Sequence, residues 1–582
     1  MKTPQPSPAR PLPQEVLRRL VGTEARSAAE ALQGVAVEPT EIEDFRPLGD
    51  SLEWRLADAF WDGAGAIPFV RNDVPYLVNN NGRLSANAAA LVWAALHEAR
   101  ATLPERIVML ELGAGVGLFA RYFLDVFAAE CRKENSDLYE RLTFVVTDRF
   151  EKTVRGWQRD GIFAGHEAHV ALCVCDASSP GKLALPGGAP PPPLPAPVVV
   201  FCNYLLDVLP ASIARRTDAG LEQLCVRTHL AGGASTLAGA GLGSLDEARA
   251  LAASGRFEDL VRLLPLLPSI ELETAFRPWT PSTAAETELA AAVSASDRAI
   301  VNSGALACLE RILAGLAPCG LVLINDYGPV RPEDVGSHLG VQRFGGSVAL
   351  GVNFPLLESA LARRGFATAA PAGDDQRRVH TRLVARRIGP RSLEILHQRF
   401  GLETDRQLDA PQEEARAHLA AGRRNEALAA YHRMVERNPG DWQMLGEAAE
   451  YVGLQLGDHA AGLDLATSAL ERNPWSSAWL WNVLGDCLFY RQRLDDAHAA
   501  FLQAQRIDPD DPRTNLNLAY TLSARGDQTA ALGAIARGLA HDSRGHYRPR
   551  LLEKQAQVLA LLSERAAAEQ NRLVRRAERF RL

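Results

Sequence analysis

The sequence predicts two fold classes in succession, an α/β domain with a mainly parallel sheet and then an all-α solenoid of helical repeats. Between about 100 and 390, five apolar runs end in polar residues and alternate with helical stretches. Beyond 410, a unit of 35 residues recurs. The chain of 582 residues is long enough for about three domains of about 100–200 residues each.

The composition argues against several classes of function. A net charge of -7 is not that of a generally basic nucleic-acid binder. No apolar run reaches the roughly 18 residues of a membrane span, and no secretory leader is visible. We therefore expect a cytoplasmic protein with neither a nucleic-acid nor a membrane partner. The eight cysteines form no C-x-x-C pair, which predicts reduced core residues and no metal site.

We expect five segments along the chain. They are a proline-rich disordered N-terminus at 1–14, a helical region at 15–100, the α/β domain at 101–390, a linker at 391–410 and the repeats at 411–582. An alanine-rich segment with a helical pattern interrupts the strand–helix alternation at 228–300. This interruption predicts a helical insertion over the edge of the sheet.

The repeats are marked by proline and by small residues. A proline closes the second helix of each unit, because it cannot continue the hydrogen-bond ladder. An alanine or glycine lies twelve residues earlier and lets paired helices approach closely. The prolines are Pro439, Pro474 and Pro509, and the small residues are Ala427, Gly462 and Ala497. The pattern resembles the tetratricopeptide repeat over roughly 411–545. Such solenoids bind partners on a concave surface, so the resemblance implies a protein or peptide partner.

A glycine-rich loop follows the first apolar run, in IVMLELGAGVG at 107–117. Glycines admit positive φ and let a ligand approach the backbone, and the helix that follows begins with free amide groups. The acid precedes the glycines, an order that resembles motif I of class I methyltransferases rather than the dinucleotide pattern G-x-G-x-x-G. The resemblance implies S-adenosyl-L-methionine as cofactor. The expected cofactor-binding residues of the loop are Glu111, Gly113, Ala114, Gly115 and Gly117.

Acidic residues also end the next two runs. Asp148 closes FVVTD, and Asp176 closes LCVCD directly before Ala177. A carboxylate offers two acceptor oxygens, so Asp148 can accept both ribose hydroxyls of a nucleoside. Asp176 and Ala177 are expected at the adenine. Because parallel strands end at one edge of a sheet, these residues should gather there. Acids at these strand ends would suit any nucleoside cofactor, so they do not by themselves choose between cofactors.

The fourth run places the chain near one family. VVVFCNYLLDVLPAS at 198–212 is similar to the N-E-L-x-D-A-x-P segment of the MidA-like arginine methyltransferases, the mitochondrial complex I assembly factors. Segments at 147–158, 321–330 and 351–366 resemble its acid-then-helix, I-D-Y-G and V-D-F elements. The likeness covers roughly 70–390 and implies a Rossmann-like methyltransferase domain. Tyr204 stands where the family has an acid that would suit a guanidinium substrate.

Methyl transfer requires an aligned acceptor, and a base can remove the acceptor proton. Asn203 is expected to orient the acceptor or the cofactor through its amide. Asp207 is our first candidate base or substrate anchor, with a helix-capping role as the alternative. Tyr204 and Tyr327 are expected to line the acceptor pocket. Lesser candidates are Asp326, His338, His380, Asn80 and Asn87.

The leading hypothesis is a methyltransferase acting on a protein or peptide side chain, at arginine or another nitrogen, with the repeats docking the acceptor. One alternative is a small-molecule N- or O-methyltransferase whose repeats serve oligomerisation, for instance as a homodimer. Another is a scaffold with a vestigial cofactor domain. A nicotinamide enzyme is disfavoured by the order of the acid and the glycines.

Overall fold

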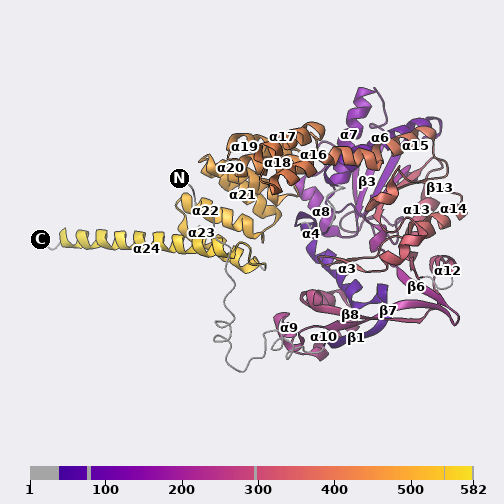
Figure 1. Cartoon of the computed structure of the whole chain (residues 1–582), viewed down its shortest axis with the longest axis horizontal. Helices are drawn as coiled ribbons and strands as arrows, with labels where there is room; N and C mark the ends of the chain where they lie inside the picture. The colour runs from indigo at the N-terminus through magenta and orange to yellow at the C-terminus, as the bar shows by residue number, and fades with distance from the viewer. Residues whose placement is uncertain (1–38, 72, 75–79, 294–297, 543, 580–582) are drawn as a thin grey trace. The chain divides into compact units, whose positions relative to one another are not determined.

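The computed structural model describes residues 39–579 except 72, 75–79, 294–297 and 543, so the segment expected at 1–14 lies outside it. The chain divides into two compact units (Figure 1). The smaller unit is Met1–Ala59 with Leu224–Phe276, and the larger is Phe60–Gln223 with Arg277–Leu582. No described helix is both long and apolar enough to cross a bilayer.

The larger unit contains a seven-stranded sheet with the order β13-β14-β10-β5-β2-β3-β4. The five strands from β10 to β4 run parallel, and β14 runs antiparallel to both its neighbours. The expected mainly parallel sheet is confirmed. The strands are β2 (Ile107–Leu112), β3 (Leu142–Asp148), β4 (Val170–Val174), β5 (Val199–Asn203), β10 (Leu321–Tyr327), β13 (Ala367–Ala369) and β14 (Val379–Ala385).

Helices cover both faces of this sheet because its side chains alternate between two apolar cores. Met109 of β2 points into one core and Leu110 into the other. The first core is covered by α6 (Arg83–Glu98), α7 (Leu118–Lys133), α8 (Glu151–Asp160) and α15 (Pro390–Phe400). The second is covered by α12 (Ala284–Ala291), α13 (Ser303–Gly315) and α14 (Phe354–Arg363).

Shorter elements complete the sheet domain. In a second set of antiparallel strands, β6 pairs with β9 on one side and with the first residues of β7 on the other. The elements are α4 (Ile67–Val70), β6 (Ser212–Thr217), β7 (Gly220–Leu230), β9 (Arg298–Val301), and a hairpin of β11 (Gln342–Phe344) and β12 (Ser347–Ala349).

The smaller unit mixes strands with helices. Its core gathers apolar residues such as Ile42, Leu230 and Leu263. The structure therefore adds β1 to the region expected to be helical at 15–100, and β8 to the insertion expected to be helical at 228–300. In IELE, at the start of β8, apolar and polar residues alternate, which is the period of a strand, whereas TEIEDF in β1 does not show this alternation. The elements are β1 (Thr40–Pro47), α3 (Leu52–Ala64), α9 (Gly233–Gly239), α10 (Leu245–Ser254), α11 (Phe257–Leu263) and β8 (Ile270–Pro278).

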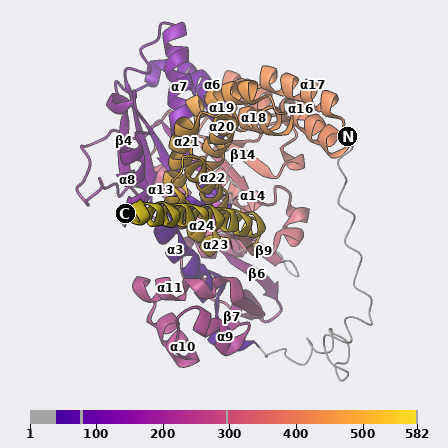
Figure 2. The same ribbon diagram turned by 90° about the vertical axis from the view of Figure 1, so that its left-hand side faces the viewer.

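The C-terminal part of the larger unit is a helical solenoid, as the repeats predict (Figure 2). Glycines with positive φ, Gly422, Gly457 and Gly526, lie in the turns within the repeats. The helices are α16 (Leu402–Ala420), α17 (Arg424–Arg437), α18 (Trp442–Glu450), α19 (His459–Arg472), α20 (Ala478–Tyr490), α21 (Leu494–Ile507), α22 (Pro512–Ala524), α23 (Gln528–His541) and α24 (Arg548–Arg579).

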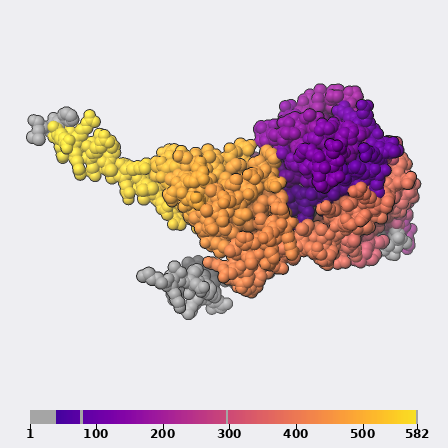
Figure 3. Space-filling view, turned by 90° about the horizontal axis from the view of Figure 1, so that it is seen from above, coloured from indigo at the N-terminus to yellow at the C-terminus, as the bar shows by residue number. Residues whose placement is uncertain are grey.

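The solenoid joins the sheet through helices rather than through the linker expected at 391–410. This segment forms α15 and the start of α16. Leu396 and Phe400, four residues apart, lie on one face of α15 and enter the core that covers the sheet. At the other end, α24 packs through Leu551 and Val558, and its later residues are exposed (Figure 3).

Candidate site at the carboxyl edge of the sheet

The glycine-rich loop adopts a conformation that requires its glycines. Gly113, Gly115 and Gly117 have φ of +66°, +56° and +78°, a region that side chains with a Cβ rarely enter. A Cβ on Gly115 would lie 3.1 Å from Cζ of Phe69. The amide of Ala114 donates to the carbonyl of Thr147 at 2.8 Å, which ties the loop to β3. A ligand can therefore approach the loop backbone closely.

Two carboxyl groups flank this loop. Glu111 ends β2 almost fully buried, and burial with the nearby charge of Asp148 raises its pKa to about 8. Its Oε1 accepts from Asn203 Nδ2 at 3.2 Å, whereas Oε2 has no partner among the described residues. Asp148 accepts from the amides of Gly115 (3.1 Å) and Phe150 (3.0 Å), and burial raises its pKa to about 6.

Asp176 and Ala177 lie just beyond the end of β4. The carboxylate of Asp176 is 47% exposed and accepts from the amide of Ser178 at 2.8 Å. Ala177 is buried. The strand order reverses between β2 and β5, because β3 and β4 follow on one side and β5 on the other. Ligands of open α/β sheets bind at such a switch point, next to the carboxyl ends of the strands.

A row of polar side chains continues from Glu111 across the sheet. Asn203 accepts at Oδ1 from Asn325 Nδ2 at 2.8 Å, and Asn325 accepts at its own Oδ1 from the hydroxyl of Thr381 at 2.7 Å. Asn325 and Thr381 were not predicted from the sequence. The available signal was a polar residue inside the apolar run LVLIND.

Next to this row the chain turns sharply after β5. Tyr204 has a φ of +50°, and its amide donates to the carbonyl of Asn325 at 2.8 Å. The rings of Tyr204 and Tyr327 lie 5.1 Å apart between centroids. The structure thus brings together the two tyrosines that were expected to line one pocket.

Asp207 and Asp326 form a buried carboxyl pair beside these rings. Asp326 accepts from the amides of Leu205 (3.2 Å), Leu206 (2.7 Å) and Tyr327 (2.9 Å), which stabilise its charge, although burial still raises its pKa to about 6. Burial and the charge of Asp326 raise the pKa of Asp207 well above its usual range. Asp207 is therefore the member of the pair that keeps a proton near neutral pH.

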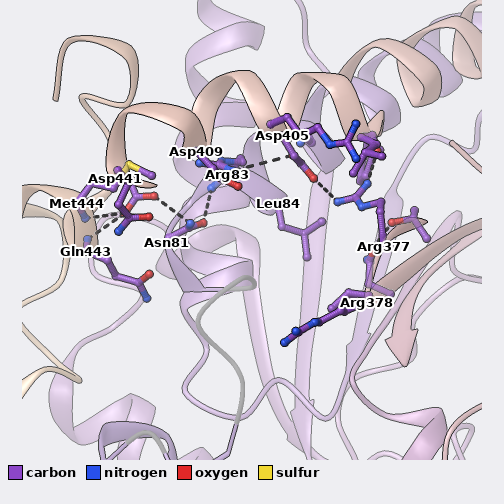
Figure 4. Close-up of a pocket in the computed structure, with 18 of the residues that line it drawn as sticks. Asn81, Arg83, Leu84, Arg377, Arg378, Asp405, Asp409, Asp441, Gln443 and Met444 are labelled. Atoms are coloured by element: carbon purple, nitrogen blue, oxygen red, sulfur yellow. Dashed lines mark hydrogen bonds and ion pairs between the residues drawn. The ribbon is translucent and has the colours of Figure 1, made fainter. Parts of the chain in front are cut away.

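A pocket of about 400 Å³ opens where the sheet domain meets the first repeat helices (Figure 4). Asn325 and Thr381 line it together with residues of α16 and α18. Four of its eight charged side chains form ion pairs with each other. Arg83 lies 2.8 Å from Asp409, Arg377 pairs with Asp405, and Asp441 accepts from Asn81 at 2.9 Å. Arg378 and Glu413 also line the pocket and are exposed.

The remaining lesser candidates are Asn80, Asn87, His338 and His380. Asn80 accepts at its carbonyl from Trp442 Nε1 at 2.5 Å, and Asn87 Nδ2 donates to the carbonyl of Arg399 at 2.8 Å. Both join α6 and its preceding turn to later helices. His380 contacts Asp374, and His338 contacts the carbonyl of Asp334. Within the described part of the chain, no cluster of His, Cys, Asp or Glu could hold a metal ion.

Family comparisons agree with this architecture. Residues 86–353 match a family described as "Putative S-adenosyl-L-methionine-dependent methyltransferase". The matched segment includes the glycine-rich loop and the five parallel strands of the sheet. Residues 454–513 match the tetratricopeptide repeat family. The chain thus carries a methyltransferase-like sheet domain followed by tetratricopeptide repeats.

Solved structures resemble each part separately. A Burkholderia thailandensis protein bound to S-adenosyl-homocysteine is 16% identical and covers 55% of this chain and 78% of its own, with a TM-score of 0.32. A thermophilic tetratricopeptide-repeat protein of Thermus thermophilus is 20% identical and covers 30% of this chain and 100% of its own, with a TM-score of 0.22.

Among curated proteins, the BBSome complex member BBS4 of Xenopus tropicalis is 29% identical over 107 residues. The match covers 18% of this chain and 20% of that protein. The chain therefore spans only a fifth of the length of this relative.

Proposed function

We propose that this chain transfers a methyl group from S-adenosyl-L-methionine to a side-chain nitrogen of a protein or peptide. The observation that carries the proposal is the pocket lined by both the sheet domain and the first repeat helices. Asn325 and Thr381 line this pocket and belong to the hydrogen-bonded row that ends at Glu111 beside the glycine loop. An acceptor in the pocket would lie at the same edge of the sheet as the cofactor.

The residues at the loop fit this cofactor chemically. Glu111 has a buried oxygen without a partner among the described residues, and the cofactor is a cation that such an oxygen attracts. Asp148 would hold the ribose hydroxyls, and Asp176 with Ala177 would hold the adenine. The cofactor supplies a methyl group on a positively charged sulfur. The chain itself orients the acceptor and excludes water.

The carboxyl pair changes our proposal for Asp207. A carboxyl that keeps its proton near neutral pH is a poor base, so we assign Asp207 to anchoring rather than to proton removal. We keep Tyr204, Tyr327 and Asn203 as candidate contacts of the acceptor, although other residues line the pocket of Figure 4. An acceptor nitrogen would then have to arrive uncharged or lose its proton to water.

A small-molecule acceptor is the second candidate. A volume of about 400 Å³ lies within the roughly 300–1,000 Å³ typical of small-ligand sites. In that case the repeats would serve assembly rather than docking. We do not restrict the acceptor to arginine, for two reasons. Tyr204 replaces the acid that would bind a guanidinium, and the pocket carboxylates of Asp405 and Asp409 are already paired with arginines of the chain.

One experiment separates these readings. The full chain is incubated with methyl-labelled cofactor and cell lysate, and label is measured in the protein and small-molecule fractions. We expect label in protein, at a nitrogen identified by mass spectrometry. Label only in the small-molecule fraction would support the second candidate. Failure of the chain to bind S-adenosylmethionine in calorimetric titration would sink both.

A further inference from the structure

Four polar side chains from four neighbouring strands are joined in one direction across the sheet. The hydroxyl of Thr381 on β14 donates to Asn325 on β10 (2.7 Å), which donates to Asn203 on β5 (2.8 Å). Asn203 donates to Glu111 on β2 (3.2 Å). All four residues are at most 6% exposed.

The carboxylate at the end of the row fixes the orientation of each amide. Asn203 presents its NH₂ group to Glu111 Oε1, which is the orientation that an ionised carboxylate requires because it can only accept. The oxygen of Asn203 then accepts from the NH₂ group of Asn325, and the oxygen of Asn325 accepts from Thr381. The three strand residues are in register, because Asn325 is the pairing partner of both Asn203 and Thr381.

A buried amide is a costly choice for the middle of a sheet. Burying an amide is unfavourable unless its hydrogen bonds are made, and an apolar residue would pack there without that cost. The row therefore serves something other than the stability of the sheet, and its last member is Glu111.

We propose that Thr381 and Asn325 are positioning residues, which act through Asn203 to hold Glu111 Oε1 and leave Oε2 to accept from the bound cofactor. The proposal rests on the proposed function, since it needs S-adenosylmethionine at the loop. It extends the cofactor site by two strands, to residues that do not touch the cofactor themselves.

The proposal predicts a particular pH dependence of cofactor binding. The titratable groups that interact electrostatically with Glu111 are Asp148 from β3 and Cys202 from β5, and Cys202 lies in the core on the other face of the sheet. A cationic ligand favours the ionised form of Glu111, so affinity should improve as the pH rises through the pKa of about 8. Loss of the Thr381 hydroxyl weakens the support of the carboxylate. The pH midpoint of binding should then move upward.

The test is calorimetric titration of S-adenosylmethionine into the full chain between about pH 6 and 9. For Thr381→Val we expect about tenfold weaker binding at pH 7 and a midpoint raised by about half a unit or more. Thr381→Ser, which keeps the hydroxyl, should restore both. Thr143→Val is the matched control, because Thr143 is also a buried strand threonine but lies on β3 outside the row.

If Thr381→Val does not fold, Asn325→Ile replaces it with the same expected result. A folded variant that keeps the affinity and the midpoint of the wild type would overturn the proposal. A wild-type chain that does not bind S-adenosylmethionine would instead overturn the proposed function. In an Asn203→Ala background, Thr381→Val should have no further effect; an additive loss would contradict action through Asn203.

Discussion

The repeats and the sheet edge use buried polar side chains in different ways. In the repeats, Asn482 donates to Thr514 Oγ1 at 2.7 Å and accepts from Asn517 at 3.1 Å, a residue 35 positions later in the next unit. At the sheet edge, the row of amides ends at Glu111, whose Oε2 has no partner among the described residues. Asp207 Oδ1 is in the same situation.

Buried polar groups with all their hydrogen bonds made hold neighbouring elements together, whereas buried polar groups without a partner are available to a ligand. The satisfied amides of Asn482 and Asn517 link one repeat to the next, so their value is stability. An ionisable oxygen without a partner lowers stability, and such groups gather where a ligand supplies the missing contact. Four substitutions test this contrast, together with the pH test of Thr381.

The largest effect is expected at the loop. Gly115→Arg places a side chain at a φ of +56° and against the ring of Phe69, so cofactor affinity should fall by about 100-fold or more in calorimetric titration. Gly161→Arg is the control, because Gly161 has a φ of +64° with open space around it. Equal losses in both variants would mean that backbone strain, rather than the loop position, decides binding.

Replacement of the Glu111 carboxyl, whose Oε2 has no partner among the described residues, should stabilise the protein. The pKa of Glu111 is raised from 4.5 to about 8, so its contribution to stability is present below about 4.5 and is lost as the pH rises through about 8. Glu111→Gln removes this dependence. We expect its free energy of unfolding to exceed that of the wild type by about 3 kcal/mol at pH 8, and little at pH 4.

Urea unfolding at the two pH values measures this difference, and cofactor binding should be lost in the same variant. The exposed Glu569→Gln should change neither property. A lower stability of Glu111→Gln at pH 8 would show that Glu111 is structural and would remove the contrast with the repeats.

The repeats should respond in the opposite way. Asn482→Ala leaves Thr514 and Asn517 without their shared partner, so we expect a loss of about 2 kcal/mol in thermal unfolding. Asn571→Ala, at an exposed asparagine of α24, is the control and should change stability by less than about 0.5 kcal/mol. A neutral Asn482→Ala would mean that apolar packing alone joins these repeats.

The smallest effect is expected near the end of α24. Leu573 is 56% exposed, so Leu573→Glu should change the unfolding free energy by less than about 0.5 kcal/mol. A wild-type melting temperature that falls with dilution, combined with a Leu573→Glu melting temperature that does not, would instead reveal that this helix is covered by a second copy of the chain.

The sequence predicted the sheet and the loop because both depend on local patterns. Apolar runs mark the buried strands, and only glycine suits the backbone angles found at Gly113, Gly115 and Gly117. The helix α15 was missed because its apolar residues are interspersed with polar ones, and the burial of Leu396 and Phe400 depends on α6. The strand β8 was missed because it lies between helical segments.

The contacts within the candidate site were harder to predict, since they join residues that are far apart in the chain. Asn325 and Asn203 are separated by 122 positions, and Asn203 and Glu111 by 92. The raised pKa of Asp207 likewise depends on the charge of Asp326, which lies 119 positions later in the chain. A single sequence gives the residue types at strand ends, but the partners come from the order of the strands.

The polar row also bears on how the sheet assembles. Alternate residues of a strand face opposite sides, so a shift of one residue in β10 would turn Asn325 away from Asn203 and Thr381 together. Each buried group left without a partner costs about 1–3 kcal/mol. The same four side chains therefore disfavour mispaired strands during folding. Because their contacts lie within the strands, longer connections between the strands would leave this preference for one register unchanged.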